Sequence, residues 1–158
     1  MKKFYLTTFG CQMNLHDSEK MAGILSNEGL AMTDNPRDAD VIIFNTCSIR
    51  EKAEQKFFSE LGRIKHLKRK KPDLKIAVAG CIAQHRGEEI FKRASHVDIV
   101  FGPQNIYRLK ELLMSQGNAI ANEDNPYVAE IDLPVLRRDQ GRAWVSIMYG
   151  CDNFCSYC

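Results

Sequence analysis

The sequence lacks any apolar run long enough to cross a membrane, and it lacks a strong charge of either sign. No run approaches the roughly 20 apolar residues that a membrane-spanning helix needs. The first ten residues contain neither a sustained apolar core nor a small-residue cleavage site, so we expect no secretory signal peptide. The formal net charge is +2, so charge alone does not indicate a nucleic-acid partner. These absences predict a cytoplasmic protein with no membrane association.

The sequence also shows no recognisable combination of general acid, general base and nucleophile. Cysteine, in contrast, is plentiful. The chain has six cysteines in 158 residues. Without a secretory signal, cysteines at this density indicate reduced thiols or metal ligands rather than a disulfide framework. The composition, 44% hydrophobic and 27% charged, is that of a globular protein with room for one packed domain and part of another.

Three of the cysteines, Cys151, Cys155 and Cys158, form a Cys-x3-Cys-x2-Cys run directly after the apolar stretch 144–150. A cubane iron–sulfur cluster normally takes four thiolates, so a run of three can hold the cluster and leave one iron open to a substrate or cofactor. The spacing is too short for a ββα zinc finger and differs from the four-cysteine ferredoxin run. A structural zinc site with a distant fourth ligand remains an alternative.

Apolar runs and amphipathic stretches alternate along residues 1–116. Strands are predicted at 3–9, 41–44, 76–79 and 97–101. Helices are predicted from a cap at Asn14 or Asp17 to Gly29, over about 48–71, over 83–94, and from a cap at Asn105 to Gly117. Continuous apolar runs such as 41–44 suit strands that are covered on both faces. The alternation predicts an α/β fold: an open, mostly parallel sheet with flanking helices.

The composition changes after residue 116. Asn, Asp, Glu and two prolines dominate 117–141, which we predict to be a linker with a short edge strand near 127–133. A new strand is predicted to start at Arg142 and to lead into the terminal cysteine run. The predicted division is therefore an α/β domain over 1–116, a linker over 117–141, and the start of a second domain over 142–158.

The other three cysteines, Cys11, Cys47 and Cys81, each fall just past a predicted strand and just before a predicted helix. In an open parallel sheet, ligands bind beyond the carboxyl ends of the strands. Helix N-termini behind the thiols present free N–H groups and partial positive charge, which lowers thiol pKa values and favours a thiolate-bound metal. The pattern favours a second three-thiolate site.

Ordinary structural roles remain alternatives for this second set of cysteines and for the residues near them. Free cysteines are often small buried core residues, and His85, one helical turn after Cys81, could be either a ligand or an ordinary surface side chain. Asn14 and Asn45, close in sequence to Cys11 and Cys47, could donate side-chain N–H groups to cluster sulfurs, and turn or capping hydrogen bonds would explain them equally well.

The densest basic run covers 65–71, at the end of a predicted helix. Cations at a helix C-terminus interact favourably with the helix dipole, and this account is sufficient for the run. Contacts with RNA phosphates are the alternative.

Taken together, the motifs resemble those of the radical S-adenosylmethionine (radical SAM) methylthiotransferases. The resemblance is carried by Gly-Cys-Gln-Met-Asn at 10–14, Asn-Thr-Cys-Ser-Ile-Arg-Glu-Lys-Ala at 45–53, Gly-Cys at 80–81 and the terminal cysteine run. The segment after Cys47 is similar to the MiaB family, which modifies tRNA. The resemblance covers essentially the whole chain.

This resemblance implies two [4Fe–4S] clusters, with Cys11, Cys47 and Cys81 as ligands of an auxiliary cluster and Cys151, Cys155 and Cys158 as ligands of the cluster that chelates S-adenosylmethionine. The implied reaction places a methylthio group on C2 of N6-isopentenyladenosine, next to the tRNA anticodon. One S-adenosylmethionine yields a 5′-deoxyadenosyl radical and another supplies the methyl group. The implied partners are tRNA, S-adenosylmethionine and an electron donor such as a flavodoxin or ferredoxin.

The family pattern continues beyond residue 158, into a partial TIM barrel and an RNA-binding domain. We therefore expect an N-terminal fragment, inactive alone, whose residues 142–158 are the first strand of a truncated barrel and whose residues 117–158 are mobile or packed non-natively. The alternatives are methylthiolation of threonylcarbamoyl-adenosine in tRNA, methylthiolation of a ribosomal-protein aspartate, a non-catalytic iron–sulfur electron-transfer module and a zinc-stabilised binding domain.

Overall fold

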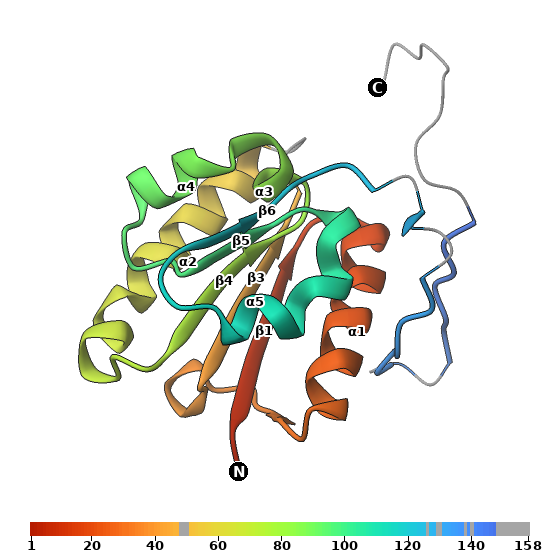
Figure 1. Ribbon diagram of the computed structural model, residues 1–158, viewed down its shortest axis with the longest axis horizontal. Coiled ribbons are helices and arrows are strands. Elements are labelled where there is room, and N and C mark those ends of the chain that lie inside the picture. The colour runs from red at the N-terminus through yellow and green to blue at the C-terminus, as the bar shows by residue number, and fades with distance from the viewer. Residues whose placement is uncertain (48–50, 126, 129–130, 138, 140, 148–158) are drawn as a thin grey trace.

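The computed structural model describes residues 1–158 except 48–50, 126, 129–130, 138, 140 and 148–158. Within the described residues, six strands form one sheet in the order β2-β1-β3-β4-β5-β6, and every neighbouring pair is parallel. The strands are β1 (Lys3–Phe9), β2 (Ala31–Met32), β3 (Val41–Thr46), β4 (Lys75–Ala79), β5 (Ile99–Phe101) and β6 (Ala119–Ala121). The predicted open parallel α/β sheet is confirmed (Figure 1).

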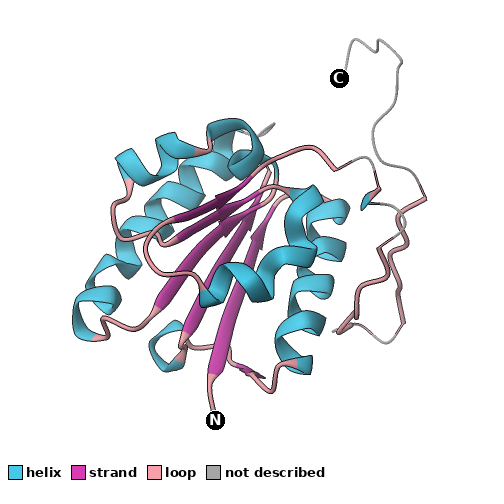
Figure 2. Cartoon of the chain, viewed as in Figure 1, coloured by secondary structure: helices cyan, strands magenta, loops and turns pink. Residues whose placement is uncertain are grey.

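Helices cover both faces of this sheet (Figure 2). The helices are α1 (Gln12–Asn27), α2 (Glu51–Lys70), α3 (Cys81–Arg86), α4 (Glu88–Arg93) and α5 (Leu109–Met114), with 3-10 turns η1 (Pro36–Asp38) and η2 (Pro103–Arg108). One core contains Met21 of α1 and Leu109 of α5, and the other contains Phe57 of α2, Ile82 of α3 and Ile90 of α4. The sheet therefore separates an α1/α5 layer from an α2/α3/α4 layer.

The central strands have the apolar character that their position requires. All six residues of β3 are buried, and so are the last four of β4. Their register pairs Asn45 with Ala79, and β3 pairs with β1 as far as Phe9 and Thr46. Since parallel strands in this register end at nearly the same level, β1, β3 and β4 finish side by side at one edge of the domain.

Two helix predictions are corrected. The helix predicted over 83–94 is two helices, because Gly87 adopts a left-handed conformation (φ +41) and ends α3 before α4 begins. The helix predicted from a cap at Asn105 begins as the 3-10 turn η2 and becomes α-helical only at Leu109. Asn105 is not the cap: its side-chain Nδ2 donates to the carbonyl oxygen of Glu123 (2.8 Å).

The edge strands also differ from the prediction. The last strand is β6, inside the segment predicted as a linker, and it is tied to the sheet by the Ala119 N–H donating to the Asp98 carbonyl oxygen (2.8 Å). No strand lies near 127–133 in the residues described there, and residues 142–147 form neither strand nor helix. The predicted domain boundaries at 116 and 141 remain predictions.

The segment after β6 returns to α1. The N–H of Leu136 donates to the carbonyl oxygen of Glu19 (3.0 Å). A Cβ on Gly23 would lie 2.2 Å from the carbonyl oxygen of Pro134, so this close approach requires glycine. Mobility of 117–158 remains a prediction. Among the helices that the structure describes, none is long and apolar enough to cross a membrane.

Candidate metal centre

Cys11, Cys47 and Cys81 lie at the carboxyl ends of three adjacent strands. Cys11 follows β1 and caps the N-terminus of α1, Cys47 follows β3, and Cys81 is the first residue of α3 after β4. β1, β3 and β4 are neighbours in the sheet. The predicted placement of the three residues beyond neighbouring strand ends is therefore found, at the end of the sheet opposite the N-terminus in Figure 1.

Glycines bring the first and third cysteine loops against the middle one. A Cβ on Gly10 would lie 2.1 Å from Asn14 Oδ1 and 3.1 Å from the Cβ of Cys47. Gly80 has φ +91, and a Cβ there would lie 2.5 Å from the carbonyl oxygen of Thr46. A larger residue at either position would push its loop away, so the two Gly-Cys turns pack on the Thr46–Cys47 segment only because each carries glycine.

A buried pair of asparagines lies directly beneath two of these loops. Asn14 on α1 is 1% exposed and Asn45 on β3 is fully buried. Asn14 Nδ2 donates to Asn45 Oδ1 (3.3 Å), and Asn45 Nδ2 donates to the Asn14 carbonyl oxygen (2.7 Å). Asn45 Nδ2 also donates to Ser18 Oγ (2.9 Å), which in turn hydrogen-bonds Thr8 Oγ1 (2.7 Å). The network joins α1 to β1 and β3.

The hydrogen bonds of this pair favour the turn-type alternative over donation of side-chain N–H groups to cluster sulfurs. Both hydrogens of Asn45 Nδ2 are used within the network, and Asn14 faces Cys11 through its oxygen. Asn14 Oδ1 accepts from the Cys11 backbone N–H (3.2 Å) and from the Cys11 thiol (3.5 Å). Asn14 and Asn45 thus hold the Cys11 loop in place as turn-type hydrogen-bond partners. Neither Asn14 nor Asp17 is the cap of α1, which begins behind Cys11.

The thiols are not assembled into a metal-binding group. Cys47 is buried (5% exposed), Cys11 and Cys81 are half-buried, and none of the three takes part in a disulfide bond. Over the part of the chain that is described, no three His, Cys, Asp or Glu side chains are gathered closely enough to hold a metal ion. His85 is exposed on α3.

The chemistry of the donors nevertheless suits a soft metal centre. Thiolates are the ligands that iron–sulfur clusters and zinc prefer. The Gly10 and Gly80 turns let two of the loops approach the third closely, and the asparagine pair links the Cys11 loop to β3. The terminal set, Cys151, Cys155 and Cys158, lies outside the described residues.

The sequence analysis did not predict that three further polar residues of α1, His16, Asp17 and Ser18, are buried. Ser18 and Asp17 lie about one helical turn after Asn14, on the same face, and each is at most 8% exposed. Burial raises the pKa of Asp17 to about 6, partly opposed by the charge of Lys20. Burial also lowers the pKa of His16, whose Nδ1 lies 3.7 Å from Glu19 Oε2. Their spacing from Asn14 was the available signal.

Comparison with known proteins identifies related sequences. Residues 3–102 match the family described as "Uncharacterized protein family UPF0004". A protein of Thermodesulfovibrio yellowstonii named tRNA-2-methylthio-N(6)-dimethylallyladenosine synthase is 54% identical over 155 residues, 98% of this chain and 36% of that protein. Proteins with the same name from Bordetella parapertussis and Chromobacterium violaceum are each 53% identical, over 99% and 100% of this chain and 34% and 37% of their own length. The chain thus spans about a third of these relatives.

Proposed function

The chain belongs to the UPF0004 family. From the names of its relatives, we propose that it is the N-terminal part of a tRNA methylthiotransferase. The proposed reaction is 2-methylthiolation of N6-isopentenyladenosine, also called N6-dimethylallyladenosine, in tRNA. Support comes from relatives of that name that match at least 98% of this chain at 53–54% identity. The proposed partners are tRNA, S-adenosylmethionine and a reducing protein such as a flavodoxin or ferredoxin, and the proposed compartment is the cytoplasm.

We propose that two cysteine sets hold [4Fe–4S] clusters, with Cys11, Cys47 and Cys81 binding an auxiliary cluster and Cys151, Cys155 and Cys158 binding the cluster that chelates S-adenosylmethionine. When bound, the two clusters would supply the sulfur chemistry and the reductive cleavage of S-adenosylmethionine. The protein's task is to hold the thiols and the base in the correct relative position.

Three contacts among the described residues support this positioning role. Asn14 accepts a hydrogen bond from the Cys11 backbone and donates one to Asn45, so Cys11 is fixed relative to β3. The Cys47 backbone N–H donates to the Phe9 carbonyl oxygen (2.8 Å), which ties the middle loop to the end of β1. Gly80 lets the Cys81 loop approach Thr46. Contacts of these kinds link the three cysteine positions to one another.

The observation that carries the proposal is the placement of three cysteines at the ends of three adjacent strands, with two Gly-Cys turns packed on the third loop. The test is mass analysis of tRNA nucleosides from cells that lack the activity and receive the full-length protein containing this chain. The proposal predicts that methylthiolated isopentenyladenosine appears, and that C47A abolishes it while leaving isopentenyladenosine.

Three results would overturn the assignment. Methylthiolated threonylcarbamoyl-adenosine, or a modified ribosomal-protein aspartate with unchanged tRNA, would move the protein to a related substrate. Failure of the full-length protein to cleave S-adenosylmethionine would support the electron-transfer alternative.

A further inference from the structure

A groove made of two adjoining hollows lies along one flank of α2, and its upper end is lined by Phe9, the last residue of β1. Its upper hollow, about 310 Å³, and its lower hollow, about 260 Å³, share Pro36 as a common wall. The residues that give it chemical character are Tyr5, Phe9, Phe44 and Lys56 in the upper hollow, and Arg37 and Lys70 in the lower hollow. We call this feature the α2 groove.

The upper hollow exposes aromatic surface because β1 is poorly covered here. β2 pairs with β1 only at Lys3 and Phe4, so no strand among the described residues lies on the outer side of the rest of β1. On the α2 face, Tyr5 and Phe9 are half-buried, and the Phe9 ring stacks on Phe44 with centroids 6.3 Å apart. Aromatic faces of this kind accept stacked bases of single-stranded RNA.

The lower hollow is basic. Lys71 is engaged, with its Nζ 2.6 Å from Asp40 Oδ1, and this contact lowers the pKa of Asp40. Arg37 and Lys70 are exposed and have no ion-pair partner within the described part of the chain. Of the described residues that line the groove, Glu60 is the sole acid, and it is paired with Arg63. The groove therefore presents unneutralised positive charge.

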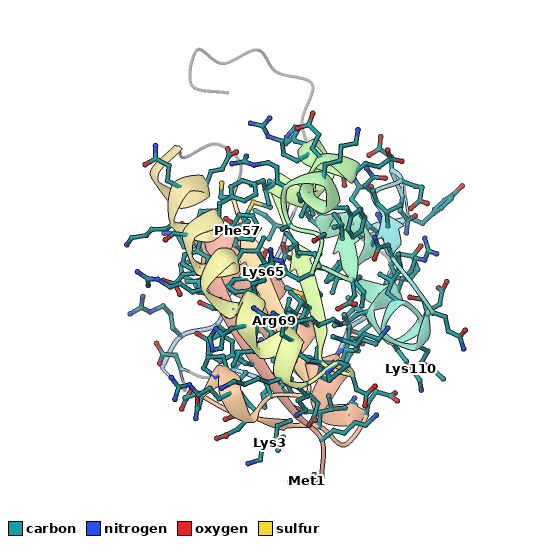
Figure 3. All side chains as sticks on the ribbon, turned by 90° about the vertical axis from the view of Figure 1, so that its left-hand side faces the viewer. Met1, Lys3, Phe57, Lys65, Arg69 and Lys110 are labelled. Atoms are coloured by element: carbon teal, nitrogen blue, oxygen red, sulfur yellow. The ribbon has the colours of Figure 1, made fainter. Side chains whose placement is uncertain are left out.

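The two hollows lie along the axis of α2, which connects the cysteine end of the domain to the N-terminal end. From Lys56 to Lys70 the helix rises about 21 Å. Figure 3 shows Phe57, Lys65 and Arg69 in succession along α2, with Lys3 and Met1 beyond its lower end. At the upper end, the Phe9 carbonyl oxygen accepts from the Cys47 N–H. A strand lying in the groove would thus arrive beside Cys47.

We propose that the α2 groove binds single-stranded RNA of the tRNA anticodon loop, with bases against Tyr5 and Phe9 and phosphates at Lys56, Arg37 and Lys70. The inference rests on the proposed function, because it takes tRNA as the partner. Aromatic faces bordered by unpaired cations are the combination that single-strand binding sites use. An acidic protein would use the cations without using the ring faces.

The test is fluorescence anisotropy of a labelled 17-nucleotide anticodon stem–loop RNA titrated with this chain between 50 and 200 mM salt. R37E/K70E should weaken binding about tenfold or more and reduce the salt slope by about 1.4, since each lost phosphate contact removes about 0.7. The control K65E/K92E makes the same change of charge at two exposed lysines outside the groove and should weaken binding less than about threefold. Y5L should weaken binding about fivefold or more with the slope unchanged.

A second measurement uses the unmodified chain and so does not depend on whether the variants fold. RNA carrying 4-thiouridine in the loop, irradiated with the unmodified chain, should cross-link to Tyr5 or Phe9. The proposal is overturned if the unmodified chain does not bind the RNA at 50 mM salt, if R37E/K70E and K65E/K92E weaken binding equally, if poly-glutamate of equal charge competes as well as RNA, or if cross-links avoid the groove. The nucleoside assay judges the enzymatic proposal separately, so either one can fail while the other stands.

Discussion

The side-chain amides of Asn14 and Asn45 meet in the protein interior, with Asn14 Nδ2 3.3 Å from Asn45 Oδ1 although 31 residues separate them in sequence. Asn14 lies on the first turn of α1, behind Cys11, and Asn45 lies on β3, two residues before Cys47. A buried amide pair that reaches two cysteine loops sets their spacing more firmly than apolar contacts would, because hydrogen bonds are directional.

Removing one partner of this pair should be costly. Asn45→Ala leaves the Asn14 side chain, the Asn14 carbonyl and Ser18 without their buried partner, so the free energy of unfolding should fall by about 2–4 kcal/mol. Urea unfolding followed by circular dichroism measures the difference. The exposed control Asn118→Ala should change it by less than about 0.5 kcal/mol. Equal small effects of both substitutions would show that the network contributes nothing.

Gly80 and Gly62 should respond to alanine in opposite directions. Gly80→Ala places a Cβ 2.5 Å from the Thr46 carbonyl oxygen at φ +91, so the protein should lose about 2–4 kcal/mol of stability. Gly62 lies in α2 with nothing within 4 Å of its added Cβ, so Gly62→Ala should add about 0.5–1 kcal/mol. Thermal and urea unfolding of both variants check this. A tolerated alanine at 80 would mean that the Cys81 loop is not held against β3.

Asp17 should make stability depend on pH. Its folded pKa of about 6 exceeds the ordinary value of 3.8 because burial disfavours the carboxylate. The folded state therefore holds the proton more tightly, and stability falls as pH rises from about 4 to about 6. Asp17→Asn removes this dependence and should stabilise the protein by about 3 kcal/mol at pH 7.5, with little gain at pH 4.

The measurement is the free energy of unfolding of both proteins at several pH values between 4 and 8. The exposed aspartate Asp73 provides the control, and Asp73→Asn should change stability by less than about 0.5 kcal/mol at each pH. A stabilisation by Asp17→Asn that is constant from pH 4 to 8, or a loss of stability at pH 7.5, would contradict the raised pKa.

The sequence predicted those elements whose signal is local and strong. Continuous apolar runs located β3 and β4, and the stripe of Met21, Ile24 and Leu25 located α1, because burial on both faces or on one face leaves a clear pattern. β2 and β6 were not predicted, because strands of two and three residues carry almost no hydrophobic pattern. They are held mainly by backbone hydrogen bonds to their neighbours.

The candidate site likewise has features that the sequence predicted and features that it did not. Strand-end placement of Cys11, Cys47 and Cys81 followed from topology, since βα turns of a parallel sheet lie at one edge. The contact between Asn14 and Asn45 did not, because residue spacing says nothing about which amide faces which across 31 residues. Nor did the break at Gly87, where a positive φ overrides a sequence otherwise suited to one helix.

We propose that Cys11, Cys47 and Cys81 hold an iron–sulfur cluster, and the direct test of this claim is anaerobic reconstitution of this chain followed by iron, sulfide and zinc analysis. The unmodified chain should take up about eight irons, and C11A/C47A/C81A and the matched variant C151A/C155A/C158A about four each. Retention of all the iron by C11A/C47A/C81A, or uptake of zinc in place of iron, would contradict the claim and leave those three cysteines as structural residues of the strand ends.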